Sequence, residues 1–200
     1  MVDEVVAAIR AGELVVVPTD TVYGLACRPD LEESVRVLSE LKGRPARQPI
    51  ALVAASVDAL VEVVPELRGR AESLARSLLP GPYTLVLPNP ARRLPWLTGE
   101  RPDTIGVRVP GVSGATAELL HAAEAVAATS ANRHGEPDPR RLDDVPRRFL
   151  EVVGAALDGG ELPGTPSTVL DLTGAEPRVL REGAVPAAEA LARARGQAPA

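Results

Sequence analysis

Residues 14–17 read Leu-Val-Val-Val, and a polar stretch, Pro18-Thr19-Asp20-Thr21-Val22-Tyr23-Gly24-Leu25, follows directly. An unbroken β-branched run is typical of a strand that is buried on both faces. The stretch places three side-chain oxygen groups, on Thr19, Asp20 and Thr21, at the carboxyl end of that strand. Ligands bind at this end of the strands in open α/β sheets. An ordinary strand-end turn held by its own side chains is the alternative.

Short apolar runs and helical patterns alternate along the rest of the chain. A capping-box-like start at Asp30-Leu31-Glu32-Glu33 and a stop at Pro45 bound a helix that ends near Lys42-Gly43. The sequence predicts an α/β fold: a twisted sheet of parallel and antiparallel strands, helices on its faces and a concave central pocket. We expect further helices over 3–11, 56–63, 66–79, 113–123 and 186–195, and further strands over 50–53, 83–87, 104–109, 126–128, 152–157, 168–172 and 178–181.

Length and composition predict one domain in a cytoplasmic protein. Two hundred residues suit a single domain with a sizeable core. No apolar run approaches the roughly 20 residues that span a bilayer, the N-terminus lacks the features of a signal peptide, and the lone cysteine, Cys27, has no partner for an internal disulfide. The net charge of −5 argues against coating nucleic acid by bulk electrostatics.

Basic residues are distributed unevenly by type. Of 22 Lys and Arg residues, all but Lys42 are arginine, which suggests that this position needs a compact ammonium; survival of one lysine by chance is the alternative. Lys42 opens the segment 42–49, which also carries Arg44 and Arg47, two prolines and no acid. A stiff cationic loop before a strand could bind an anion. The alternative is a basic loop that is exposed to solvent and binds nothing.

Two more segments place polar groups on predicted strands. Thr104 and Arg108 share one face of the strand 104–109, where a buried arginine needs an anionic partner unless it reaches solvent at a strand edge. Residues 129–132, Thr-Ser-Ala-Asn, form a second polar strand end, which could line the same edge as the first. The 15 residues from Pro88 to Pro102 form a loop long enough for a lid or binding loop.

Several motifs, taken in order, resemble those of the YrdC/Sua5 family of threonylcarbamoyl-AMP synthases over residues 13–183. The resemblance implies that residues 1–200 form one YrdC-like domain, with a short helix after residue 185 and no second C-terminal domain. The motifs are the polar stretch 18–25, Lys42-Gly43-Arg44-Pro45, Pro80-Gly81-Pro82-Tyr83-Thr84, Thr104-Ile105-Gly106-Val107-Arg108-Val109-Pro110, Thr129-Ser130-Ala131-Asn132, Pro166-Ser167-Thr168-Val169 and Leu180-Arg181-Glu182-Gly183.

The resemblance implies a nucleotidyltransferase that makes L-threonylcarbamoyl-AMP and pyrophosphate from L-threonine, bicarbonate or CO₂, and ATP. The product would serve the t6A modification of tRNA at adenosine 37, through a downstream threonylcarbamoyl-transfer complex of the TsaD type. Mg²⁺ is expected to arrive with ATP, with no protein-bound metal site, because no clustered carboxylates suggest one. A weak contact with tRNA stays open, and no membrane contact is expected.

The resemblance also assigns roles to residues. Gln48 stands where asparagine is common, and His134 follows the 129–132 motif where serine is usual, without a known task. The resemblance implies that Lys42 and Arg44 are catalytic. It implies that threonine is bound by Thr21, Arg108, Ser130 and Ser167, and that the nucleotide is bound by Arg44, Gln48, Thr104, Asn132, Arg140 and Arg181.

This residue set can be checked against the implied chemistry. A carbamate is already an anion, so its attack on a phosphate needs alignment and charge neutralisation rather than a strong base. Cations with hydroxyls and amides fit that requirement better than they fit hydrolysis. What deprotonates the threonine ammonium stays unassigned.

Two other classes of function remain. One is a double-stranded RNA or tRNA-binding module without turnover, which the net negative charge and the few aromatic residues disfavour. The other is a relative that handles a carbamoyl adenylate.

Overall fold

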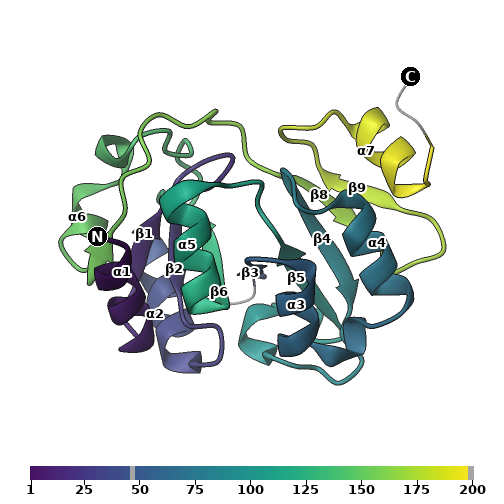
Figure 1. The fold of residues 1–200 in the computed structure, drawn as a ribbon, viewed down its shortest axis with the longest axis horizontal. Coiled ribbons are helices and arrows are strands. Elements are labelled where there is room, and N and C mark those ends of the chain that lie inside the picture. The colour runs from purple at the N-terminus through teal and green to yellow at the C-terminus, as the bar shows by residue number, and fades with distance from the viewer. Residues whose placement is uncertain (46–47, 198–200) are drawn as a thin grey trace.

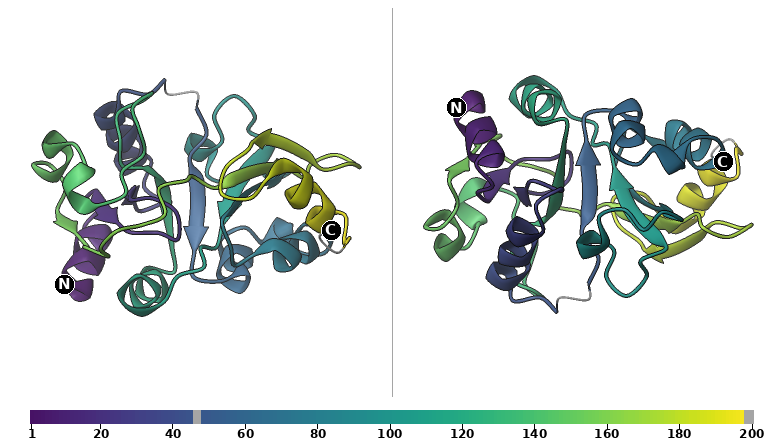
Figure 2. Two further views of the ribbon diagram at one scale, coloured as in Figure 1. Left: turned by 90° about the horizontal axis from the view of Figure 1, so that it is seen from above. Right: turned by 90° about the horizontal axis from the view of Figure 1, so that it is seen from below.

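The computed structural model describes residues 1–45 and 48–197, and its strands form one twisted mixed sheet (Figures 1 and 2). Within these residues, nine strands lie in the order β7-β1-β2-β6-β3-β5-β4-β8-β9. The pairs β1/β7, β3/β5 and β4/β8 are parallel, and the other neighbours are antiparallel. The strands are β1 Val15–Val17, β2 Gly24–Cys27, β3 Ala51–Ala54, β4 Tyr83–Pro88, β5 Thr104–Arg108, β6 Ala125–Ser130, β7 Ala155–Ala156, β8 Thr168–Asp171 and β9 Arg178–Arg181.

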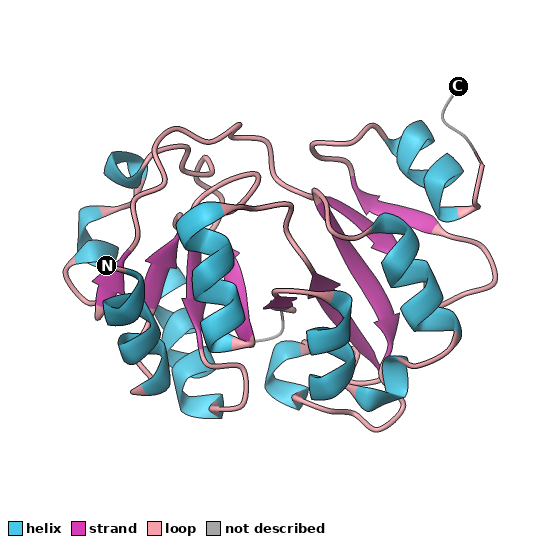
Figure 3. Ribbon diagram, viewed as in Figure 1, coloured by secondary structure: helices cyan, strands magenta, loops and turns pink. Residues whose placement is uncertain are grey.

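Helices cover both faces of this sheet, which confirms the predicted α/β class (Figure 3). Because side chains alternate along a strand, Leu25 and Leu52 face one core while Ala26 and Val53 face another. The first core contains side chains of α2, α3, α4 and α7; the second contains those of α1 and α5. The helices are α1 Val2–Arg10, α2 Glu32–Lys42, α3 Val57–Val63, α4 Arg70–Leu78, α5 Gly114–Ala123, α6 Arg147–Leu150 and α7 Ala187–Ala194, with short 3-10 turns η1 Pro65–Leu67, η2 Pro95–Leu97 and η3 Leu142–Asp144.

The second face is only partly covered by helices. Helices α1 and α5 pack over Val15, Val17 and Val126, but the same face continues past them along β6 to Ala128 and Ser130, which line an open cavity. The fold therefore leaves one stretch of sheet free for a ligand, beside the helices that stabilise it.

Several local predictions were wrong. The helix α2 has Leu31 at its N-cap without a side-chain cap, because the Asp30 carboxylate instead pairs with Arg28 at 2.6 Å. The predicted strand 152–157 shortens to β7, and the predicted helix 66–79 divides into η1 and α4 at Gly69, whose φ is +89°. Strand β2 and helix α6 were not predicted.

A long connection between β7 and β8 crosses the molecule along the top of Figure 1. The buried Tyr23 hydroxyl holds its beginning: it lies 2.9 Å from Asp158 Oδ1 and 2.8 Å from the Gly160 carbonyl, and accepts a hydrogen bond from the Gly159 amide at 2.9 Å. The connection ends at Pro166 and Ser167, which line the cavity. Tyr23 thus joins the polar stretch 18–25 to a wall of the site.

Across the described ranges, no helix has both the length and the apolar character needed to cross a bilayer.

Candidate functional site

The cavity has a volume of about 640 Å³ and lies across the face of the sheet, within the range of roughly 300–1,000 Å³ that holds small-molecule ligands. Its floor is built from small residues on neighbouring strands: Gly24, Ala128, Ala51 and Gly106. Absent or short side chains keep this floor low, and the cavity extends from β2 to β9. The predicted concave pocket is confirmed, but it occupies the sheet's face rather than one edge.

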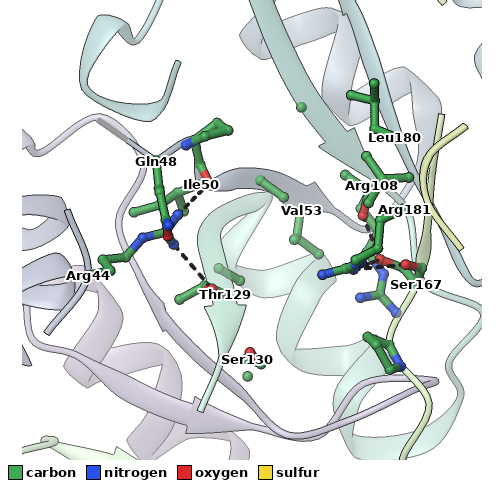
Figure 4. Close-up of a pocket in the computed structure, with 18 of the residues that line it drawn as sticks. Arg44, Gln48, Ile50, Val53, Arg108, Thr129, Ser130, Ser167, Leu180 and Arg181 are labelled. Atoms are coloured by element: carbon green, nitrogen blue, oxygen red, sulfur yellow. Dashed lines mark hydrogen bonds between the residues drawn. The ribbon is translucent and has the colours of Figure 1, made fainter. Parts of the chain in front are cut away.

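One wall of the cavity carries Lys42 and Arg44, from the end of α2 and the loop that follows it. Helix α2 ends at Gly43, whose φ of +66° is the left-handed conformation that favours glycine at this position. Arg44 donates to the Pro49 carbonyl at 2.8 Å and to Thr129 Oγ1 at 3.3 Å (Figure 4). Burial lowers the pKa of the Arg44 guanidinium to about 10, and its Nε is buried without a hydrogen-bond partner. Arg47 lies outside the described residues.

Gln48 and His134 face each other near this wall. Gln48 Nε2 and His134 Nε2 are 3.5 Å apart, and the His134 amide donates to the Lys42 carbonyl at 3.1 Å. Both residues line the cavity with Asp138. The loop after β6 is therefore tied to the cationic loop after α2.

The opposite wall contains Arg108 and Arg181 (Figure 4). Arg108 Nη2 pairs with Asp20 and donates to Thr21 Oγ1 at 2.7 Å; each side chain of the ion pair is 10% exposed. Burial lowers the pKa of Arg108, and the charge of Asp20 opposes that effect. The Arg108 Nε is buried without a hydrogen-bond partner.

Arg181 reaches the same wall from β9. It donates to the Ser167 carbonyl at 2.8 Å and to Ser167 Oγ at 3.3 Å, while Ser167 Oγ lies 2.8 Å from Thr84 Oγ1. Unlike Arg108, Arg181 makes no ion pair with any acid among the described residues. Together with Arg44, it gives the cavity two cationic groups, one on each side, that form no ion pair with an acid within residues 1–45 and 48–197.

The loop between β4 and β5 supplies a third part of the lining, including Thr98 and Arg101. Arg101 pairs with the buried Asp171 at 3.3 Å, and its carbonyl accepts a hydrogen bond from Thr104 Oγ1 at 3.0 Å. Burial would raise the pKa of Asp171, but hydrogen bonds from Thr173 and pairing with Arg101 and Arg178 lower it to about 2. The predicted binding loop does reach the cavity.

Nine of the residues selected from the sequence line this cavity, and two do not. Thr21 lies behind Arg108 and contacts its guanidinium. Arg140 lies outside the lining and pairs with Glu161 at 2.9 Å. The nine are Lys42, Arg44, Gln48, Thr104, Arg108, Ser130, Asn132, Ser167 and Arg181.

Sequence reasoning missed the counter-ion Asp20 and the rim residue Arg101. Asp20 was visible as one of three oxygen-bearing side chains in the polar stretch, but nothing in the sequence linked it to Arg108, 88 positions away. Arg101 stands in a loop without periodicity, so no pattern distinguished it from the neighbouring Arg92 and Arg93.

The donor set suits anions. Guanidinium groups, hydroxyls and amides line the cavity, and such groups bind phosphates and carboxylates. A bare divalent cation prefers several oxygen ligands, chiefly carboxylates, and the described residues contain no group of three His, Cys, Asp or Glu placed to hold one.

Comparisons with known proteins agree with this geometry. The sequence profile of the Sua5/YciO/YrdC family, described as telomere recombination, matches residues 7–183. A threonylcarbamoyl-AMP synthase of Pyrococcus abyssi is 39% identical over 182 residues, which are 90% of this chain and 53% of that protein. A putative threonylcarbamoyl-AMP synthase of Mycobacterium tuberculosis strain H37Rv is 36% identical over 181 residues, 90% of this chain and 82% of that one.

Solved structures give the same match. The crystal structure of P. abyssi Sua5 complexed with L-threonine has a TM-score of 0.83 at 35% identity, and the match covers 98% of this chain and 57% of that chain. The chain thus spans little more than half the length of its P. abyssi relative.

Proposed function

The chain belongs to the Sua5/YciO/YrdC family, and from this we propose that it is a nucleotidyltransferase that forms L-threonylcarbamoyl-AMP. Its substrates are L-threonine, CO₂ or bicarbonate, and ATP, and its second product is pyrophosphate. We further propose that the adenylate passes to a tRNA threonylcarbamoyl-transfer complex of the TsaD type for modification at adenosine 37.

The observation that carries this proposal is the pair of unneutralised arginines in one cavity. Arg44 and Arg181 lie on opposite walls, and neither is paired with an acid in the described part of the chain. A reaction between two anions, a carbamate and a triphosphate, needs positive charge on both sides of the reacting atoms. The crystal structure of P. abyssi Sua5 is a complex with L-threonine, which supports an amino acid as one occupant.

The wall that contains Arg108 and Ser167 suits the amino acid. The carboxylate of threonine meets the Arg108 guanidinium, whose Nη2 is already oriented by Asp20 and Thr21. Ser167 Oγ, close to Thr84 Oγ1 and Arg181, offers a hydrogen-bond partner to the substrate. The amine then forms an N–C bond with CO₂ and releases a proton, which gives the carbamate anion.

The wall that contains Arg44 suits the nucleotide. A carbamate oxygen attacks the α-phosphorus, the bond from phosphorus to the bridging oxygen breaks, and pyrophosphate leaves with its electron pair. Arg44 and Arg181 stabilise the charge that develops on the phosphates, while Thr104, Gln48 and Asn132 orient the nucleoside. Mg²⁺ bound to ATP would neutralise part of the phosphate charge, and the described residues offer no group of three His, Cys, Asp or Glu that would hold the ion instead.

The test is release of pyrophosphate. The protein with ATP, L-threonine and bicarbonate together should release it and yield a product with the mass of threonylcarbamoyl-AMP, and omission of any one substrate should abolish release. Arg181→Met should release pyrophosphate about tenfold more slowly at ATP concentrations below the KM, whereas the matched control Arg36→Met, which alters an exposed arginine paired with Glu33 and Glu40, should keep the wild-type rate. Pyrophosphate release without threonine would overturn the proposal, and salt-sensitive RNA binding without turnover would favour an RNA-binding module.

A further inference from the structure

Lys42, the chain's only lysine, is enclosed by oxygen atoms of its own protein. It is 5% exposed. Its Nζ lies 2.6 Å from the Ser130 carbonyl, 3.0 Å from the Asn132 carbonyl, 2.6 Å from Asn132 Oδ1 and 3.2 Å from Ser130 Oγ. All four atoms belong to the segment that ends β6.

The oxygen atoms around Lys42 Nζ are sufficient to accept all three protons of its ammonium group. Lysine has three N–H donors, and three of the four oxygens, two carbonyls and one amide oxygen, can only accept. The fourth, Ser130 Oγ, is the most distant and also lies 2.6 Å from Asn132 Oδ1, to which it can donate. Each Lys42 proton therefore has an acceptor within the protein, and none is left over for a phosphate.

The surroundings also explain why this position is not arginine. A guanidinium is planar and its donors lie in one plane, so it does not fit oxygens arranged around a single nitrogen. Lys42 is also the last residue of α2, where the helix dipole favours a cation. Burial and the neighbouring Arg44 oppose that charge and lower the pKa of Lys42 to about 8, while Asp138 opposes the effect of Arg44.

We propose that Lys42 is a positioning residue, which fixes Ser130 and Asn132 against the cavity and does not itself bind the phosphates of ATP. The Asn132 side chain is held at both ends, with Oδ1 accepting from Lys42 and Nδ2 donating to the Glu136 carbonyl. Lys42 thereby shapes the surface that the nucleoside and the amino acid contact. This inference deepens the proposed function and rests on it for the identity of the ligands.

The test compares ligands with and without phosphate. Calorimetric affinities for ATP, adenosine and L-threonine are measured for the wild type, Lys42→Met, Lys42→Arg and the control Arg44→Met. Lys42→Met should lower the affinities for ATP and adenosine by the same factor, about tenfold, and should lower the affinity for L-threonine as well. Lys42→Arg should bind these ligands no more tightly than Lys42→Met, although it keeps the positive charge. Arg44→Met should lower the affinity for ATP about tenfold and change the affinity for adenosine by no more than about twofold.

The inference would be overturned if Lys42→Met lost affinity for ATP but not for adenosine, or if Lys42→Arg kept nearly the wild-type affinity for ATP. Circular dichroism checks that the variants fold. If neither Lys42 variant folds, the double variant Ser130→Ala, Asn132→Ala decides. It leaves the two carbonyls as the acceptors for three ammonium protons, so the preference for ATP over adenosine should rise if Lys42 was fully engaged before, and an unchanged preference contradicts the inference. These readouts need no turnover, so a wild type that binds ligands but releases no pyrophosphate refutes the proposed function and leaves this comparison decisive.

Discussion

Replacement of Asp20 by asparagine should destabilise the protein strongly, because Asp20 is the counter-ion of a buried arginine. Both side chains of the Asp20–Arg108 pair are 10% exposed, and Arg181 adds a like charge that lowers the pKa of Arg108 further. Removal of one partner of a buried pair typically costs 3–5 kcal/mol. Asparagine keeps one acceptor for Arg108, so we expect a loss of about 3 kcal/mol in the free energy of unfolding, or roughly 6–12 °C in Tm at this chain length.

Urea unfolding of the wild type and Asp20→Asn measures this difference directly. The matched control is Glu151→Gln, which removes one acid from the Arg147–Glu151 pair, whose side chains are 91% and 59% exposed. Exposed pairs contribute little, so the control should stay within about 0.5 kcal/mol of the wild type. If Asp20→Asn were as mild as the control, the Asp20–Arg108 contact would not be a buried ion pair, and Arg108 would not be held in place by it.

Three further results are expected. Arg181→Met should raise the KM for ATP about tenfold with little effect on urea unfolding, because Arg181 is exposed. The Asp171 pKa of about 2 lies below its ordinary 3.8, so the ionised carboxylate stabilises the folded protein fully above pH 3.8, and this contribution is lost as the pH falls towards 2. Asp171→Asn should remove this pH-dependent contribution of about 2 kcal/mol to the free energy of unfolding, measured in a pH series of urea melts. The Lys42 pKa of about 8 lies below its ordinary 10.5, so the unfolded chain binds more protons between these values. The wild type should therefore gain about 3 kcal/mol relative to Lys42→Met as pH rises from 8 to 10.5.

The sequence predicted most elements of the fold because their patterns are local. Val5, Val6 and Ile9 form a helical stripe and are buried on α1, and Leu14–Val17 contains the buried β1. Strand β2 was missed because Gly24 and Ala26 are poor β-formers that directly follow a turn-like polar stretch. Ala26 packs in the second core and Gly24 lines the cavity floor, so tertiary position rather than propensity determines this strand.

The candidate site was predicted where a motif carries a distinctive residue and missed where only pairing in space reveals it. The placement of Thr104 and Arg108 on one face of β5 was confirmed, since both line the cavity, and alternation along a strand suffices to predict it. The two polar strand ends do lie at the same end of the sheet: β1 and β6 both run antiparallel to β2, which lies between them, so their carboxyl ends coincide. The pairing of Arg108 with Asp20 depends on the fold of the polar stretch over the sheet, which no local pattern encodes.

Strand order explains why the two unneutralised arginines share one cavity yet stay apart. Arg44 contacts Thr129 on β6, and Arg181 lies on β9; β3, β5, β4 and β8 separate these strands. The small residues Ala51 and Gly106 of the intervening strands form part of the cavity floor, so the cavity extends from Arg44 on one side to Arg181 on the other. An acid on the floor would pair with one of them and remove its charge from the ligand. Asp20 instead lies outside the cavity lining and pairs with Arg108, so it neutralises Arg108 and leaves Arg44 and Arg181 without a carboxylate partner among the described residues.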